Sequence, residues 1–317
     1  MFRLDPSYVG KVWPAFMWGV TVVAAIGCCM GFKSFVWFMS VGYGFAVMCI
    51  GVFHLLFGLF NHSLTAATAV MSVLFIIYGY RLGGYILKRE LTNKDYKKKL
   101  DSTGSTKAMP LPVSLFMWAY SMWMYTAQTS ALSYRVMNRA SDNLFAWIGI
   151  IIMCLAIYGE ATADAQKSAA KKINPKRFCD TGLYRYCRCP NYFSEVLFWA
   201  GVTVSGIGAV QGRQWIICLI ALCLITYVMY NSAQRLELRH EKTYGLDPEY
   251  QKYSDTVPLL FPLVALTRVS SAAVLSAMPP QPQMPMMPTR AGSTLSCSDR
   301  KSTAAMKSSV LMSGDAI

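Results

Sequence analysis

The sequence predicts an all-α, polytopic membrane helix bundle of about seven transmembrane helices with a cytosolic C-terminus, and three observations support this fold class. Hydrophobic residues make up 54% of the 317-residue chain and charged residues only 15%, which is typical of membrane proteins. Seven apolar runs have, or nearly have, the ~20 residues that a spanning helix needs. Basic residues gather in loops between these runs, where they orient a membrane protein rather than bind nucleic acid, despite the net charge of +14.

The apolar runs define the expected membrane domain, residues 1–268. In order, they cover residues 12–31, 35–60, 63–87, 112–134, 143–162, 192–210 and 214–232. A further apolar piece at 257–267 is too short to span and is expected to lie at the membrane interface. From about residue 269 the chain is rich in Ser, Pro, Met and Thr without periodicity, which predicts a disordered tail over 269–317.

The charges of the loops predict the orientation of the chain. The loops 88–110 and 163–191 carry seven basic residues each, namely Lys88, Arg89, Lys94, Lys97, Lys98, Lys99 and Lys107, and Lys167, Lys171, Lys172, Lys176, Arg177, Arg185 and Arg188. The opposite side carries only Arg3, Lys11, Arg135, Arg139 and Arg213. The positive-inside rule therefore places the N-terminus outside or in a lumen and the C-terminus in the cytosol.

One stretch, TGLYRYCRCPNYFSEVLFW over Thr181–Trp199, enters the sixth apolar run from the predicted cytosolic side. Pro190 favours the first position of a helix, where its missing N–H costs nothing. The N–H groups of the next three residues are then expected to lack partners within the helix: Asn191, Tyr192 and Phe193. This end of the helix is a candidate site for an anion.

Charged residues on both sides of this helix start strengthen the candidate site. Arg185 and Arg188 precede it, and guanidinium groups bind phosphate well. Glu195 lies one turn inside the apolar run, on the same helix face as Asn191. An ionisable group at that depth is costly and suggests a function. The alternative is a membrane-entry loop whose basic residues only anchor the topology.

The third apolar run ends in YGYRLGGYILKRE, which contains further candidates. Tyr78 and Arg81 are three residues apart and share a helix face. The Arg81 guanidinium either reaches into the bundle or extends to the interface, and Tyr78 either acts in the site or anchors the helix at the interface. Gly83 and Gly84 are expected to permit close contact with another helix.

A pair of carboxylates marks the end of the fifth run, IYGEATADAQKSAAKK. Glu160 and Asp164 are four residues apart and share a face, near a helix C-terminus that disfavours negative charge. We therefore expect a partner for them, either Arg185, Arg188 or the hydroxyl groups of a ligand. The alternative is that this segment is a solvated extension of the helix beyond the membrane.

Histidine and cysteine residues give weaker signals. His240 and Tyr244 are four residues apart on one predicted helix face, and they matter only if that face meets the 181–199 stretch. Cys179, Cys187 and Cys189 match no common zinc spacing, so no metal site is predicted.

The stretch GLYRYCRCPNYFSEVLFW resembles the C-terminal catalytic domain of the steroid 5α-reductase superfamily, and most closely its branch with a GLWRYSRHPNYFGE-like motif. Further segments are similar to that branch: YGEATAD to FEAIAD, YGYRLGGYILKRE to a WGLRL segment, and EYQKYSDTVPLLFP to a closing AEYQ…IP segment. The resemblance covers roughly residues 1–265. It implies a reductase of the endoplasmic reticulum that binds NADPH in a cytosol-facing cavity and reduces a double bond conjugated to a carbonyl.

The resemblance also implies roles for residues of this chain. Tyr78 matches a tyrosine that hydrogen-bonds the substrate carbonyl, which makes it the predicted catalytic acid for a lipid-like enone, such as a sterol or an isoprenoid. The predicted cofactor-binding residues are Arg81, Glu160, Asp164, Arg185, Arg188, Asn191, Tyr192, Glu195, His240 and Tyr244.

The sequence departs from the family pattern at three points. Cys189 stands where the branch usually has His, Ser194 stands where it has Gly, and residues 6–89 contain no Asp or Glu, although steroid reductases use a glutamate in an early span. The same framework also resembles isoprenylcysteine methyltransferases, which use S-adenosylmethionine. That activity, or a membrane protein of this fold without catalysis, is the alternative function.

Overall fold

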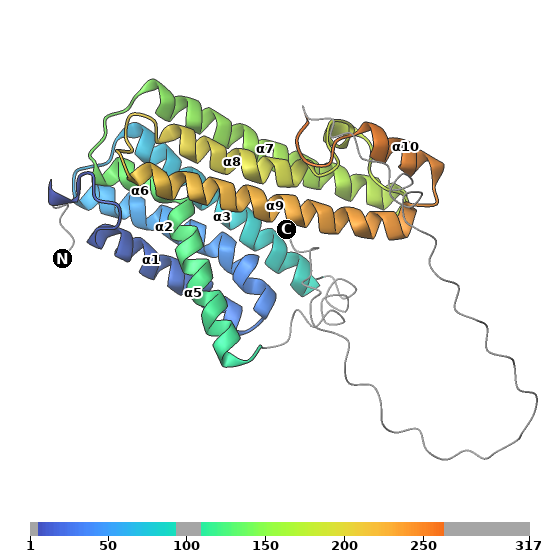
Figure 1. Ribbon diagram of the computed structural model, residues 1–317, viewed down its shortest axis with the longest axis horizontal. Helices are drawn as coiled ribbons and strands as arrows, with labels where there is room; N and C mark the ends of the chain where they lie inside the picture. Colours follow the sequence, from blue (N-terminus) through green and yellow to red (C-terminus); the bar gives the residue numbers. More distant parts are fainter. Residues whose placement is uncertain (1–5, 93–108, 263–317) are drawn as a thin grey trace, which may run out of the picture. The chain divides into compact units, whose positions relative to one another are not determined.

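The computed structural model describes residues 6–92 and 109–262, and the regular structure in these ranges is entirely helical (Figure 1). The α-helices are α1 (Ala15–Cys28), α2 (Val41–Phe60), α3 (Ala66–Thr92), α5 (Leu111–Gln128), α6 (Ser130–Met137), α7 (Leu144–Ile173), α8 (Pro190–Ser205), α9 (Gln214–Tyr244) and α10 (Pro248–Thr256). Short 3₁₀ helices are η1 (Pro6–Tyr8), η2 (Cys29–Phe32), η3 (Phe35–Met39) and η4 (Gly182–Arg185). The all-α fold class is confirmed. The predicted tail over 269–317 and most of the 88–110 loop lie outside the described residues.

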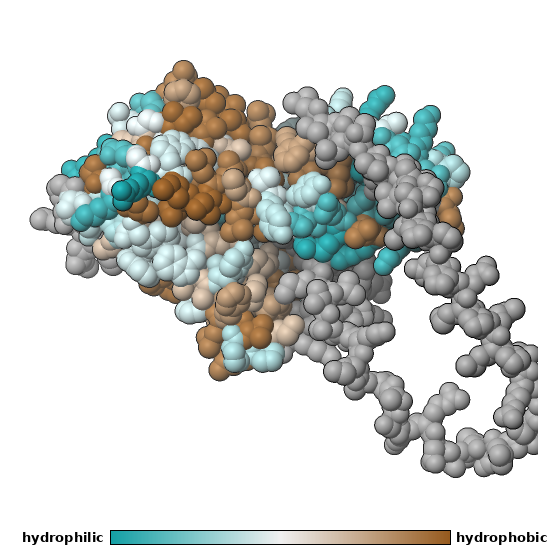
Figure 2. Space-filling view, in the orientation of Figure 1, coloured by the Kyte–Doolittle hydropathy of each residue, from teal (hydrophilic) through white to brown (hydrophobic). Residues whose placement is uncertain are grey.

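Within residues 6–92 and 109–262, five helical segments are long and apolar enough to cross a membrane: Ala15–Phe32, α2, α3, α7 and α9. This supports an integral membrane protein. Figure 2 shows apolar residues over much of the face that α7, α8 and α9 form, and hydrophilic residues gathered where α9 ends beside α10. The other two predicted spans contain α5 and α8, of which α8 has only 16 residues.

Two helices continue well beyond the apolar runs that predicted them. The fifth run, 143–162, becomes a helix that ends at Ile173, and the seventh run, 214–232, becomes one that ends at Tyr244. Their last turns are rich in Ala, Lys, Glu and Leu, which favour helix without membrane burial. The extensions of α7 and α9 therefore carry polar side chains out from the apolar bundle toward the predicted site.

Glycines bring α2 and α3 into close contact. A Cβ atom added at Gly79 would lie 2.3 Å from the carbonyl oxygen of Gly44, and one added at Gly44 would lie 2.5 Å from the amide nitrogen of Gly83. Small residues at such contacts let helix backbones approach each other. The prediction is correct for Gly83 and wrong for Gly84, since an added Cβ at Gly84 meets no described atom within 4 Å.

A similar contact joins α7 to α8. A Cβ atom added at Gly149 would lie 2.5 Å from the carbonyl oxygen of Gly201. In Figure 1, α9 runs alongside α8, which lies between α9 and α7. The ends of α3, α7 and α9 and the start of α8 meet at one end of the bundle, as contacts between their side chains show below.

Candidate functional site

An ion-pair cluster joins α3 to α7 at this end of the bundle. The Arg81 guanidinium contacts the Glu160 carboxylate, and its Nη1 lies 3.6 Å from Asp164 Oδ2. Arg81 therefore reaches into the bundle instead of extending to the interface. The prediction that Arg185 or Arg188 pairs with these carboxylates is wrong. The acidic face of α7 packs against α3, where Arg81 forms the ion pairs with both carboxylates.

A cavity of about 240 Å³ lies beside this cluster. Its polar lining consists of side chains from α3, α7 and α8, namely Arg89, Glu160, Asp164, Lys167, Ser168, Lys171, Asn191 and Tyr192. Apolar groups of Leu82, Tyr85, Ile86 and Leu236 close it. The structure thus brings together predicted site residues from widely separated parts of the chain, and adds basic groups from α3 and α7 that the resemblance did not supply.

A smaller hollow adjoins the cavity and shares Lys167, Lys171 and Asn191 with it. Arg188, His240 and Tyr244 line this hollow, so the predicted His240 face does meet the 181–199 stretch. Lys171 Nζ donates a hydrogen bond of 2.8 Å to Tyr244 Oη. Arg185 is exposed in η4 and lines neither of these two cavities.

The start of α8 is as predicted in its position but not in all its hydrogen bonds. Pro190 occupies the first turn, and Phe193 N donates to the carbonyl of Cys189 at 3.0 Å, so the expectation of a partnerless Phe193 amide is wrong. Just before the helix, Arg188 N donates to Pro258 O at 2.9 Å and Cys189 N to Leu259 O at 3.0 Å. The short apolar piece after α10 thus pairs with the motif.

Arg188 holds α8 against α9. Its guanidinium contacts the carboxylate of Glu237, and both side chains are 7% exposed. Tyr250 Oη donates a further hydrogen bond of 3.1 Å to Glu237 Oε1. Sequence reasoning missed Glu237, although a carboxylate in the extension of an apolar helix is a signal of the same kind as Glu160.

Burial keeps the two cysteines of the motif in the thiol form. Burial raises the pKa of Cys187 to about 11 and that of Cys189 to about 12. A thiol is a poor nucleophile and a poor metal ligand in this state. No cluster of three or more metal-binding side chains occurs among the described residues.

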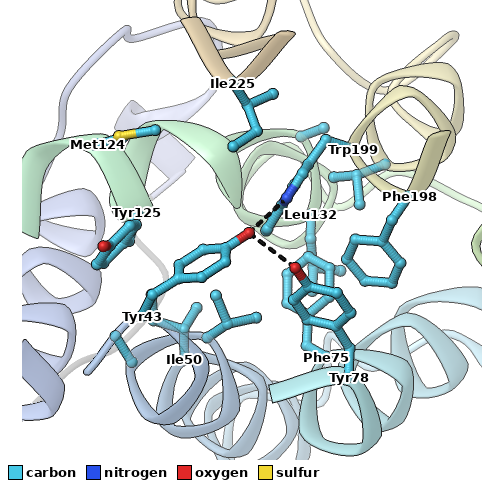
Figure 3. Packing of buried hydrophobic residues seen from close by; sticks show 14 of the residues in the cluster. Tyr43, Ile50, Phe75, Tyr78, Met124, Tyr125, Leu132, Phe198, Trp199 and Ile225 are labelled. Atoms are coloured by element: carbon cyan, nitrogen blue, oxygen red, sulfur yellow. Dashed lines mark hydrogen bonds between the residues drawn. The ribbon is translucent and has the colours of Figure 1, made fainter. Parts of the chain in front are cut away.

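Deeper in the bundle, Glu195 joins a cluster of aromatic donors. Figure 3 shows three of them, Tyr43, Tyr78 and Trp199. Tyr43 Oη and Tyr78 Oη each lie 2.5 Å from Glu195 Oε1, and 2.9 Å from each other. Trp199 Nε1 donates to Tyr43 Oη at 2.7 Å. Tyr78 is fully buried, so the reading of it as an interfacial anchor is wrong. Glu195 shares the helix face of Asn191 but reaches these phenols and not the cavity.

One of the three comparisons with known proteins gave a match. A family model described as a protein of unknown function, DUF1295, matches residues 28–257. The chain belongs to this family. DUF1295 proteins are membrane proteins of the steroid 5α-reductase-like type. The search of curated proteins and the search of solved structures gave no match. The DUF1295 match includes every predicted site residue, from Tyr78 on α3 to Tyr244 on α9.

Proposed function

We propose that the protein is an NADPH-dependent membrane reductase that acts on a carbon–carbon double bond of a lipid-like enone, such as a sterol or an isoprenoid. The observation that carries the proposal is the position of the basic cavity relative to the buried phenol of Tyr78. Leu82, which lines the cavity, lies one helical turn from Tyr78 on α3. A cofactor bound in the cavity would thus lie one helical turn along α3 from the residue that we propose as the acid.

The donor chemistry of the cavity fits a phosphorylated dinucleotide. Arg89, Lys167 and Lys171 line it and provide cations for phosphate groups. Asn191 and Asp164 provide amide and carboxylate groups for hydroxyls and the carboxamide. S-adenosylmethionine has no phosphate and carries a sulfonium cation, which this basic lining disfavours.

The cavity must enlarge to hold the whole cofactor. Its 240 Å³ is below the roughly 300–1,000 Å³ of typical ligand pockets. The adjoining hollow, which Arg188, His240 and Tyr244 line, extends the space toward α9. We propose that the hydrogen bond between Lys171 and Tyr244 opens when phosphate binds, because phosphate is a better partner for a lysine than a phenol.

When bound, NADPH supplies a hydride to the β-carbon of the enone. Tyr78 donates a hydrogen bond to the carbonyl oxygen, on which negative charge develops, and its phenol stays protonated at neutral pH. The ion pairs of Arg81 with Glu160 and Asp164 hold α3 against α7, which fixes the position of Tyr78 relative to the residues of α7 that line the cavity.

The same proposal includes the membrane topology. Seven spans, with α5 and α8 crossing in addition to the five most apolar segments, place the basic ends of α3 and α7 on the cytosolic side. NADPH is available there, and the chain's C-terminus lies on that side too. The endoplasmic reticulum is the proposed membrane.

A deuterium-transfer experiment tests the proposed reaction. The purified protein in lipid nanodiscs is supplied with NADPH deuterated at the transferred position, together with a panel of sterol and isoprenoid enones. We expect one product with deuterium at its β-carbon. Parallel samples receive S-adenosylmethionine and an isoprenylcysteine. Methyl transfer in these samples, without any reduced product in the others, would identify the methyltransferase instead. Absence of both reactions across the panel would support the fold without catalysis.

A further inference from the structure

The cluster around Glu195 has an arrangement that the proposed function does not use in full. The phenol groups of Tyr43 on α2 and Tyr78 on α3 point toward the same atom, Glu195 Oε1. This atom lies 2.5 Å from each phenol oxygen. Trp199 Nε1 lies 3.1 Å from the same carboxylate oxygen. The groups are buried, with Tyr43 at 3% and Glu195 at 1% exposure.

The other carboxylate oxygen of Glu195, Oε2, is buried and has no hydrogen-bond partner among the described residues. All donors of the cluster converge on Oε1, and a buried oxygen without a hydrogen bond is energetically unfavourable. The phenols are therefore arranged around a position for one oxygen, and the carboxylate that fills it is only partly satisfied.

We propose that Tyr43 and Tyr78 form a two-phenol clamp for a ligand oxygen that carries negative charge, and that Glu195 Oε1 fills this clamp until the ligand displaces it. The inference rests on the proposed function for its substrate class: the ligand oxygen is the carbonyl oxygen of an enone as it becomes an enolate. Tyr43 is then a second catalytic residue, beside Tyr78. It comes from a span that has no carboxylate.

The electron balance of the step is simple. The hydride pair forms the new C–H bond at the β-carbon, and the π electrons of the double bond move toward the carbonyl oxygen as an enolate. The α-carbon later takes a proton from water, which completes the reduction. The phenols hold the oxygen by hydrogen bonds and keep their protons, so the clamp itself is not consumed.

The walls of the clamp suit an apolar, flat ligand. The ring of Tyr78 stacks on Phe198 with centroids 4.1 Å apart and an interplanar angle of 11°. The ring of Tyr43 packs on Tyr125 at 4.8 Å. Figure 3 shows Ile50, Leu132 and Ile225 close to these rings. Hydrogen bonds to a developing charge are strongest in such water-poor surroundings.

Binding of a stable anion tests the clamp without any turnover. The probe is 4-nitrophenol with a decyl chain, whose phenolate form mimics the enolate oxygen and absorbs differently from the phenol. It is titrated into the full-length protein in nanodiscs, and the bound phenolate is measured by absorbance. We expect Tyr43→Phe and Tyr78→Phe each to weaken phenolate binding at least about tenfold, the effect of one lost hydrogen bond to a charged group.

Two further variants complete the test. Tyr134→Phe is the matched control, because Tyr134 is equally buried but donates to the backbone carbonyl of Val12 at 2.7 Å, and it should bind the probe as the wild type does. Glu195→Gln should bind phenolate more tightly, because no charged carboxylate then competes for the clamp.

The outcomes separate this inference from the proposed function. Equal phenolate affinity in Tyr43→Phe and the wild type overturns the clamp, as does unchanged or weaker binding in Glu195→Gln. The deuterium experiment tests the proposed reductase activity independently of the clamp. If the protein reduces no enone but still binds the probe through Tyr43 and Tyr78, the proposed reaction is wrong and the anion-binding site is still supported.

Discussion

The residues that carry the account lie in one buried network. Tyr78 was predicted as the acid, and the structure places its phenol inside the bundle, against Glu195 and Tyr43. Part of this was accessible from the sequence, because Tyr78 and Glu195 lie in recognisable segments. Tyr43 was not, since 152 positions separate it from Glu195 and no local pattern marks it.

Tyr78→Phe tests the role of the phenol. The substitution keeps the ring that stacks on Phe198 and removes only the donor. We expect NADPH affinity to stay unchanged while turnover of a lipid enone falls at least roughly tenfold, or about 1.4 kcal/mol of barrier. Steady-state kinetics and equilibrium binding on the same preparation measure both, with Tyr134→Phe as the control. Full turnover in Tyr78→Phe would leave the carbonyl without its proposed acid.

At the scale of helices, the apolar runs predicted the position of each long helix but not where several end. Hydropathy falls where α7 and α9 leave the apolar layer, while helix propensity continues through Ile173 and Tyr244. Arg188 shows the consequence. Its sequence context suggested a phosphate contact, whereas the extension of α9 brings Glu237 to its guanidinium.

Substitution of Glu237 tests this link between α8 and α9. Glu237→Ala leaves the buried Arg188 without the carboxylate it contacts, and we expect the folded protein to lose about 3–5 kcal/mol. Glu249→Ala is the control, because Glu249 pairs with Arg177 at the surface and its removal should change little. Denaturant unfolding in detergent measures both. Equal stability of the two variants would show that the buried pair does not hold the helices together.

Glycines of α3 allow a second test at the scale of helices. Gly79→Ala places a methyl group 2.3 Å from the carbonyl oxygen of Gly44, so α2 and α3 must move apart and stability should fall. Gly84→Ala meets open space on the same helix, and it should gain roughly 0.5–1 kcal/mol from helix propensity. Thermal unfolding compares them. A stabilised Gly79→Ala protein would contradict the close packing described here.

At the scale of the whole molecule, the sequence predicted a membrane bundle and a basic face from composition and charge alone. It did not predict which side chains meet there, because pairs such as Arg81 with Glu160 depend on how α3 and α7 pack.

A glycosylation experiment tests the proposed orientation of the chain in the membrane. A glycosylation acceptor placed after residue 300 should remain unmodified in microsomes if the C-terminus is cytosolic. Its modification would invert the proposed topology, and with it the side from which the cavity opens.

The central claim is that the cavity between α3, α7 and α8 binds NADPH. The most direct measurement is a calorimetric titration of the purified protein with NADPH and, in parallel, with S-adenosylmethionine. The account predicts saturable binding of NADPH and none of S-adenosylmethionine. It also predicts weaker binding in Lys171→Ala, which removes a cation from the cavity, and unchanged binding in the control Lys11→Ala, which alters an exposed residue before α1. Binding of S-adenosylmethionine without binding of NADPH would contradict the account.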